Sequence, residues 1–236
     1  MTSRPDTYSK PGHRRVESVN VGGRRRVDWA GRVVETAIWK QPVHGRINAT
    51  GVNLAGDDQA DRRVHGGPDK AIYAYATDDY EWWSQQLGRE LGPGTFGENL
   101  TVSGIDLAGA LVGEQWRIGT TMLEVTQPRL PCFKLGIRMR DSGFVDRFEQ
   151  AQRFGTYLRI IEDGTLAAGD AIEVIGRPGH GLTITDLGKA SPRPGVEMIE
   201  RILAVPEVPD SWREWAERAR SRQARGSGES APVHDA

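Results

Sequence analysis

Short runs of strand-forming residues, many of them broken by glycine, dominate the first three quarters of this 236-residue chain. Side chains of this kind favour a pleated, half-buried strand, and they recur at residues 32–39, 70–76, 98–102, 155–161 and 170–175. Residues 114–119 and 121–127 meet near Gly119–Thr120, which predicts a hairpin, and Asp163–Gly164 predicts a further turn. The 29 glycines suit the tight corners of a strand-rich barrel. The sequence therefore predicts a mainly β fold of the α+β class.

Two helices are predicted to interrupt these strands. Thr77 can cap a helix over residues 78–87 that stops at Gly88, and Asp141 or Ser142 can open another over residues 143–152. Each helix gathers apolar side chains on one face, which indicates core packing rather than a ligand site: Tyr80, Trp83 and Leu87 in the first, and Phe144, Phe148 and Ala151 in the second.

The two ends of the chain differ in character from its middle. Residues 1–15 are polar and rich in turn formers, so we expect a flexible leader before a main domain over residues 16–176. Beyond a glycine- and proline-rich linker, residues 182–224 predict a small helical appendage, with amphipathic helices over 195–205 and 210–224. Ser211 and Glu214 have capping-box spacing in the second of these. Residues 225–236 predict a disordered tail.

Composition excludes several classes of function. A formal net charge of −1 gives no electrostatic reason to bind a nucleic acid polymer or an anionic membrane. A single cysteine excludes an internal disulfide and a four-thiolate iron–sulfur cluster. No apolar run of about 18 residues could span a membrane, and no apolar segment follows the basic N-terminus as in a secretory signal, so a cytoplasmic location is expected.

Candidate functional side chains gather in a few glycine-rich polar segments. One segment leads directly into a predicted strand and contains Asp57, Asp61, His65, Asp69 and Lys70. A second contains Glu98 and Asn99 behind Gly97, where backbone N–H groups can face a ligand. A third forms a turn with Lys40 and Arg46 around it. Any one of these alone is more often a turn with solvated charges.

Cys132, the only cysteine, has basic residues on both sides in the sequence. It follows Pro131, with Arg129 and Lys134 within three residues, on what we expect to be a stiff loop. Nearby positive charge favours the thiolate, the form that attacks carbon or binds a metal. A small buried cysteine with no chemistry is the alternative, and the residues alone leave both open.

Three segments together resemble the MOSC family, in particular its small bacterial YiiM-like branch. They are GDDQADRRVHGGPDKAIYAY, FGENLTV and VTQPRLPCFKLG, at residues 56–75, 96–102 and 125–136, and the resemblance extends from about Val16 to Ile175. It implies a barrel-like fold that holds a molybdenum–pterin cofactor, with Cys132 as the protein's thiolate ligand to the metal. By matching position, the candidates for contacts with the cofactor and its phosphate are Lys40, Arg46, His65, Lys70, Asn99, Gln127, Arg129 and Lys134.

The resemblance also implies an activity. The branch is similar to reductases that remove oxygen from N-hydroxylated bases and related N-oxygenated small molecules, for which His65 could pass a proton or could merely tie its glycine turn. The electrons would come from a separate flavin or iron–sulfur protein. The branch commonly carries a three-helix C-terminal domain that can support partner or homodimer contacts, and here residues 182–224 predict an abridged version of it.

Two other functions stay open at this stage. The domain could carry the molybdenum cofactor, or a persulfide on Cys132, without reductase turnover. Alternatively, Cys132 could act as a nucleophile paired with His65, which would require no metal.

Overall fold

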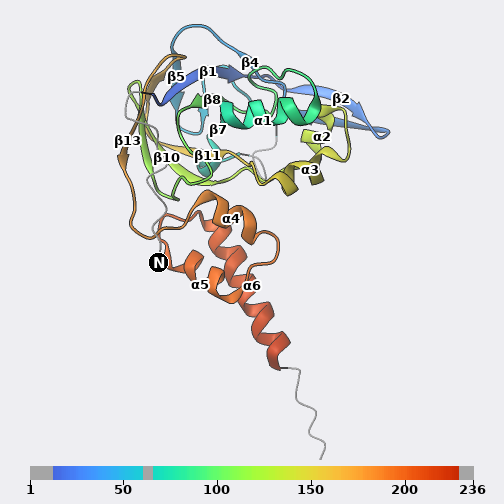
Figure 1. Ribbon diagram of the computed structural model, residues 1–236, viewed down its shortest axis with the longest axis vertical. Helices are drawn as coiled ribbons and strands as arrows, with labels where there is room; N and C mark the ends of the chain where they lie inside the picture. Colours follow the sequence, from blue (N-terminus) through green and yellow to red (C-terminus); the bar gives the residue numbers. More distant parts are fainter. Residues whose placement is uncertain (1–12, 61–65, 229–236) are drawn as a thin grey trace, which may run out of the picture.

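The computed structural model describes residues 13–60 and 66–228 (Figure 1). Most of the predicted leader, His65 and the end of the predicted tail therefore lie outside the described residues. The main feature is an eight-stranded mixed sheet in the order β13-β9-β10-β11-β7-β8-β1-β4. Its strands are β1 (Arg15–Val21), β4 (Gln41–Pro42), β7 (Ile72–Ala76), β8 (Leu100–Ser103), β9 (Gln115–Ile118), β10 (Thr121–Pro128), β11 (Thr156–Glu162) and β13 (Ile172–Gly176).

Pairing within the sheet is antiparallel except between β7 and β8, which run parallel. The predicted hairpin at Gly119–Thr120 is confirmed, since Thr121 pairs with Ile118 across β9 and β10. Two small sheets complete the strand set. One is β12 (Gly164–Leu166), β5 (Ile47–Thr50) and β6 (Asn53–Leu54), and the other is the projecting hairpin of β2 (Arg25–Trp29) and β3 (Arg32–Thr36) (Figure 1).

The predicted barrel is not found as a closed ring of strands in the part of the chain that the structure describes. The strand order has two ends, β13 and β4. The first strand nevertheless approaches the far edge, because Arg15 forms an isolated bridge with Ala171 and the Val16 N–H donates to the Asp170 carbonyl at 3.0 Å. The fold is thus mixed α+β, built on a large curved sheet.

Both predicted interior helices form, with small corrections at their starts. Helix α1 (Thr77–Leu87) is capped by Ala76 rather than Thr77, because Ala76 keeps the extended backbone and no side-chain cap bond forms. It ends at Gly88, whose φ of 61° is the left-handed value a glycine accepts readily. Helix α3 (Phe144–Ala151) has Gly143 as its N-cap, and Asp141 accepts the Gly143 N–H at 2.9 Å.

The aromatic faces of these helices pack in the core, as predicted. Trp83 and Phe148 stack with their ring planes 3° apart and their centroids 5.8 Å apart, and Phe144 and Phe96 lie against them. This aromatic cluster includes Tyr73 and Tyr75 and packs α1 and α3 against β7.

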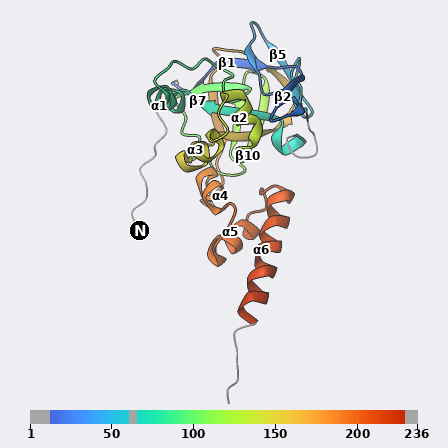
Figure 2. The ribbon, with the colours of Figure 1, turned by 90° about the vertical axis from the view of Figure 1, so that its right-hand side faces the viewer.

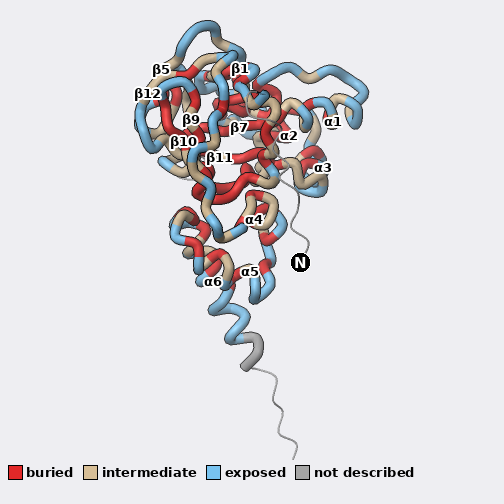
Figure 3. The backbone as a smooth tube through the Cα atoms, turned by 60° about the vertical axis from the view of Figure 1, so that its left-hand side comes forward, coloured by how far each residue is buried: buried red, intermediate tan, exposed pale blue. Residues whose placement is uncertain are grey.

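Three helices follow the sheet, whereas the amphipathic patterns predicted two. They are α4 (Ile184–Ala190), α5 (Val196–Ala204) and α6 (Asp210–Gly228), and they lie together on one side of the sheet (Figures 1 and 2). A capping box joins Thr183 to Asp186 at the start of α4, while α6 begins one residue before the predicted cap Ser211. Leu187, Ile202 and Trp212 of these helices belong to the same apolar cluster as Trp116 and Val125 of the sheet. Figure 3 marks buried residues both in the sheet and in these helices.

Candidate functional site

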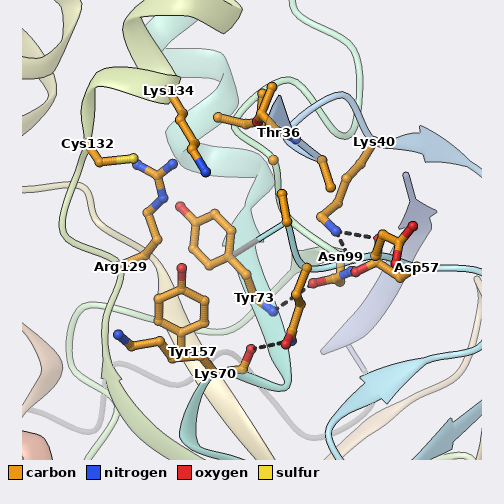
Figure 4. Close-up of a pocket in the computed structure, with 16 residues that line it drawn as sticks. Thr36, Lys40, Asp57, Lys70, Tyr73, Asn99, Arg129, Cys132, Lys134 and Tyr157 are labelled. Carbon is orange, nitrogen blue, oxygen red and sulfur yellow. Dashed lines mark hydrogen bonds and ion pairs between the residues drawn. The ribbon is translucent and has the colours of Figure 1, made fainter. Parts of the chain in front are cut away.

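One cavity gathers most of the predicted functional residues. It lies where β7, β11, the 3-10 helix η1 (Pro68–Lys70), the segment after β3 and the start of helix α2 (Phe133–Met139) meet (Figure 4). Its polar lining includes Lys40, Asp57, Lys70, Tyr73, Asn99, Arg129, Cys132, Lys134 and Tyr157.

Cys132 is the N-cap of α2. The prediction of a loop is therefore wrong from Phe133 onward, where the helix begins. Its backbone is extended, with φ −134° and ψ 169°, and its carbonyl accepts the Leu135 N–H at 2.8 Å. The thiol is half-buried, lines the cavity and lies beside the Arg129 guanidinium in Figure 4. Proline before the cysteine and a helix after it restrict the direction of the thiol.

Arg129 is the most unusual cation of the cavity, because its side chain is only 6% exposed and its Nη1 has no hydrogen-bond partner among the described residues. Its Cζ lies 5.8 Å from the ring centroids of both Tyr73 and Phe148. A buried guanidinium nitrogen without an acceptor is costly, so the position is suited to an anionic ligand that would supply one.

Tyr73 and Tyr157 were missed as site residues. They are register partners on β7 and β11, their ring centroids are 5.4 Å apart, and Tyr73 donates to the Phe154 carbonyl at 2.8 Å. Burial raises the pKa of both phenols, and the positive charge of Arg129 only partly opposes this effect. Both therefore stay protonated near neutrality and can donate a hydrogen bond but cannot accept a proton as phenolate.

Lys40 is held by an internal carboxylate. Its Nζ lies 2.5 Å from both Asp57 oxygens, and the two side chains are 8% and 2% exposed. Asp57 also accepts from the Gly22 N–H at 2.8 Å and from Asn99 Nδ2 at 2.9 Å. Burial lowers the pKa of Lys40, and Asp57 opposes that shift.

Asn99 shapes the cavity through bonds to its own chain. Besides Asp57, its Nδ2 donates to the Asn20 carbonyl at 3.2 Å, and its Oδ1 accepts the Tyr73 N–H at 3.1 Å. The Gly97 and Asn99 N–H groups, which were predicted to face a ligand, instead donate to the Gly94 and Tyr73 carbonyls at 3.2 and 2.8 Å. The Gly94 and Phe96 N–H groups just before them bond the buried Glu98 carboxylate at 2.6 and 3.2 Å.

Two lysines complete the cationic lining. Lys134 lies in the first turn of α2, and Lys70 ends η1. Burial lowers the pKa of Lys70, while the neighbouring Asp69 opposes the shift.

Two predicted residues, Arg46 and Gln127, do not line this cavity, and a third, His65, is not described. Arg46 is half-exposed and pairs with Asp170, its Nη2 lying 2.8 Å from Oδ1. Gln127 is buried, and its Oε1 accepts from Trp212 Nε1 of α6 at 2.9 Å. His65 lies outside the described residues, so its predicted role is not addressed by the structure.

The residues present fit an anionic organic group that carries a soft metal. A thiol, a buried guanidinium nitrogen that lacks an acceptor and nearby lysines supply a soft ligand and positive charge at one place. Within the described residues no group of three or more His, Cys, Asp or Glu side chains could hold a metal by itself. A metal bound by Cys132 in this cavity would therefore need ligands beyond those that the described residues supply. Over the same residues, none of the helices combines the length and apolar character needed to cross a membrane.

Comparisons with known proteins agree with this fold. A family model described as the MOSC domain matches residues 61–173. Over 200 residues the chain is 33% identical to "Uncharacterized protein YflK" of Bacillus subtilis, a match that covers 84% of this chain and 90% of YflK. A protein named "Reductase" from Gibberella moniliformis is 30% identical over 160 residues, which cover 66% of this chain and 28% of that protein. The crystal structure of YiiM from Geobacillus stearothermophilus has a TM-score of 0.72 at 26% identity, and the match covers 87% of this chain and 98% of that one.

Proposed function

Because this chain belongs to the MOSC domain family, we propose that it is a molybdenum–pterin-dependent reductase acting on N-hydroxylated bases or related N-oxygenated compounds. One observation carries the proposal: the only thiol of the chain lines the same cavity as a buried guanidinium nitrogen that lacks a partner among the described residues. The name of the fungal relative supports the reaction class, although this chain spans only 28% of that protein.

The chain's own residues would divide the task of holding the cofactor. Cys132 would be the protein ligand to the metal, and Arg129 and Lys134 would neutralise the negative charge of the pterin and its phosphate. Tyr157 would donate a hydrogen bond from a phenol that stays protonated, whereas the Tyr73 O–H is already donated to the Phe154 carbonyl. When bound, the cofactor supplies a two-electron centre that can take oxygen from an N–O bond.

The reaction requires protons and electrons in equal number. Converting an N-hydroxylated amine to the amine and water consumes two electrons and two protons. Lys70, a lining residue of the cavity whose pKa is lowered by burial, is the proposed proton carrier. His65 remains a second proposed proton carrier. The electrons would come from a separate flavin or iron–sulfur protein.

Metal and pterin analysis tests this proposal directly. The full chain would be purified from molybdenum-replete cells as wild type, as Cys132→Ser and as Arg46→Gln, the last being a matched control because Arg46 is outside the cavity. We expect near-stoichiometric molybdenum and pterin in the wild type and the control, and loss of molybdenum in Cys132→Ser. Reduction of an N-hydroxylated base by chemically reduced protein should follow the bound molybdenum.

The outcomes separate the competing functions. Bound cofactor without turnover would favour a carrier. A wild type that stays free of molybdenum after exposure to purified cofactor would contradict the proposal, and cysteine-dependent activity in such protein would favour a nucleophile.

A further inference from the structure

A second cavity lies at the other end of helix α2. It has a volume of about 310 Å³ and is formed by Trp39, the segment 89–95 after helix α1, and the last residues of α2 together with Arg140. It has no lining residue in common with the cavity that contains Cys132, as far as the described residues go. It is therefore a separate site.

The charge of this second cavity is strongly one-sided. Arg89, Arg138 and Arg140 line it, and Glu90 is the only acidic residue among its described lining residues. Over residues 13–60 and 66–228, no ion pair joins any of these three arginines to a carboxylate. Arginines elsewhere in the protein, such as Arg46 and Arg159, do have acidic partners.

Arg138 has a buried hydrogen-bond donor that a ligand could satisfy. Its Nε is buried and has no hydrogen-bond partner among the described residues. Burial lowers the pKa of Arg138, and the positive charges of Arg89 and Arg25 add to that effect, although Tyr80 and Glu98 oppose it. An anion placed between these guanidinium groups would both accept the unsatisfied N–H and relieve the repulsion between like charges.

The walls of the cavity also indicate what the anion is attached to. Trp39, Leu91 and Met139 provide apolar surface next to the arginines. Guanidinium groups match the oxygens of a phosphate through paired hydrogen bonds, and an indole ring is a good surface for a planar apolar group.

We propose that this second cavity binds a small organic phosphate, with the phosphate group held by Arg138, Arg89 and Arg140 and the organic part against Trp39. The site goes beyond the proposed reductase function and does not depend on it, because none of its residues lies in the Cys132 cavity.

Calorimetric titration of the full chain tests the site, with phenyl phosphate and inorganic phosphate as probes. We expect saturable binding of one phenyl phosphate per chain, tighter than that of inorganic phosphate. Arg138→Gln and Arg89→Gln should each weaken it about tenfold or more. Arg218→Gln is the matched control, because Arg218 is exposed on α6 and pairs with Glu214 four residues before it, and it should bind like the wild type.

Two results would overturn the proposal. One is equal affinity in the wild type, Arg138→Gln and Arg89→Gln, or no saturable binding at all. The other is binding that is lost in Lys134→Gln and retained in Arg138→Gln, which would assign the phosphate to the Cys132 cavity. Arg89 is exposed, so Arg89→Gln keeps the test valid even if Arg138→Gln fails to fold.

Discussion

Replacing Asp57 with asparagine would remove the only carboxylate that bonds the buried ammonium of Lys40 within residues 13–60 and 66–228. In the wild type that carboxylate lies 2.5 Å from Lys40 Nζ through each of its oxygens, and both side chains are less than 10% exposed. Breaking a buried pair by removing one charge costs about 3–5 kcal/mol. Asparagine keeps one acceptor oxygen, so we expect Asp57→Asn to lower the free energy of unfolding by about 3 kcal/mol at neutral pH.

The loss should depend on pH in a defined direction. Burial already lowers the pKa of Lys40 in the folded protein, and without Asp57 that pKa falls further below the value near 10.4 expected in the unfolded chain. Between these two values the unfolded chain binds more protons than the folded one, so the stability of the variant rises with pH. The difference between wild type and variant should therefore be smaller at alkaline than at neutral pH.

Urea unfolding at neutral and mildly alkaline pH measures both effects. Glu162→Gln is the matched control, because its pair with Arg117 is exposed and 3.8 Å long, and it should cost no more than about 1 kcal/mol. The double variant Lys40→Met, Asp57→Asn should be more stable than Asp57→Asn alone, since no unpaired charge remains. A loss under about 1 kcal/mol in Asp57→Asn, or an equal loss at both pH values, would refute the reasoning.

Three further predictions concern the supports of the site. Trp212→Phe leaves the buried Gln127 Oε1 without its donor and should lower the free energy of unfolding by about 1–3 kcal/mol in urea titrations, with part of the loss recovered by adding Gln127→Leu. Gly94→Ala should cost about 1–3 kcal/mol, because Gly94 has φ +80° and a Cβ would lie 2.5 Å from the Lys40 carbonyl, whereas Gly92→Ala, with open space around it, should be nearly neutral. Burial raises the pKa of Tyr73, Tyr75 and Tyr157 in the folded protein, whereas a tyrosine of the unfolded chain ionises near pH 10. Above that pH the unfolded chain loses protons that the folded protein keeps, so the free energy of unfolding should fall by up to about 1.4 kcal/mol per pH unit for each of the three. Tyrosinate absorbance that rises before unfolding would contradict this last prediction.

Local patterns were sufficient to predict much of the fold. Strand runs with glycine corners predicted the hairpin at Gly119–Thr120, and apolar spacing predicted the buried faces of α1 and α3. Helices α2 and α4, for which the sequence analysis gave no amphipathic pattern, each contain a glycine in their interior. Glycine lowers helix propensity, yet close tertiary contacts leave no room for a side chain at either glycine. A Cβ at Gly136 would lie 2.9 Å from the Asp141 carbonyl, and one at Gly188 would lie 2.4 Å from Phe154 Cε2.

The site was less predictable, because partners far away in the sequence determine which candidate residues reach the cavity. Arg46 forms an ion pair with Asp170, which is 124 positions away in the chain, and Gln127 accepts a hydrogen bond from Trp212, which is 85 positions away. Tyr73 and Tyr157 carry no local signal, since each occupies an ordinary strand position. Only the register between β7 and β11 places their rings together. No pattern within one segment contains this information.

The partners also determine which predicted residues can serve a ligand. A cation whose charge is met by an internal carboxylate cannot fully neutralise a phosphate as well, and this describes Lys40 with Asp57 and Arg46 with Asp170. Asn99 has likewise committed its amide to bonds within the chain. Arg129 differs, since its Nη1 is buried beside Cys132 with no acceptor in the described part of the chain. The cost of that buried N–H would be recovered only when an anion arrives, so binding energy at this cavity should depend more on Arg129 than on Lys40.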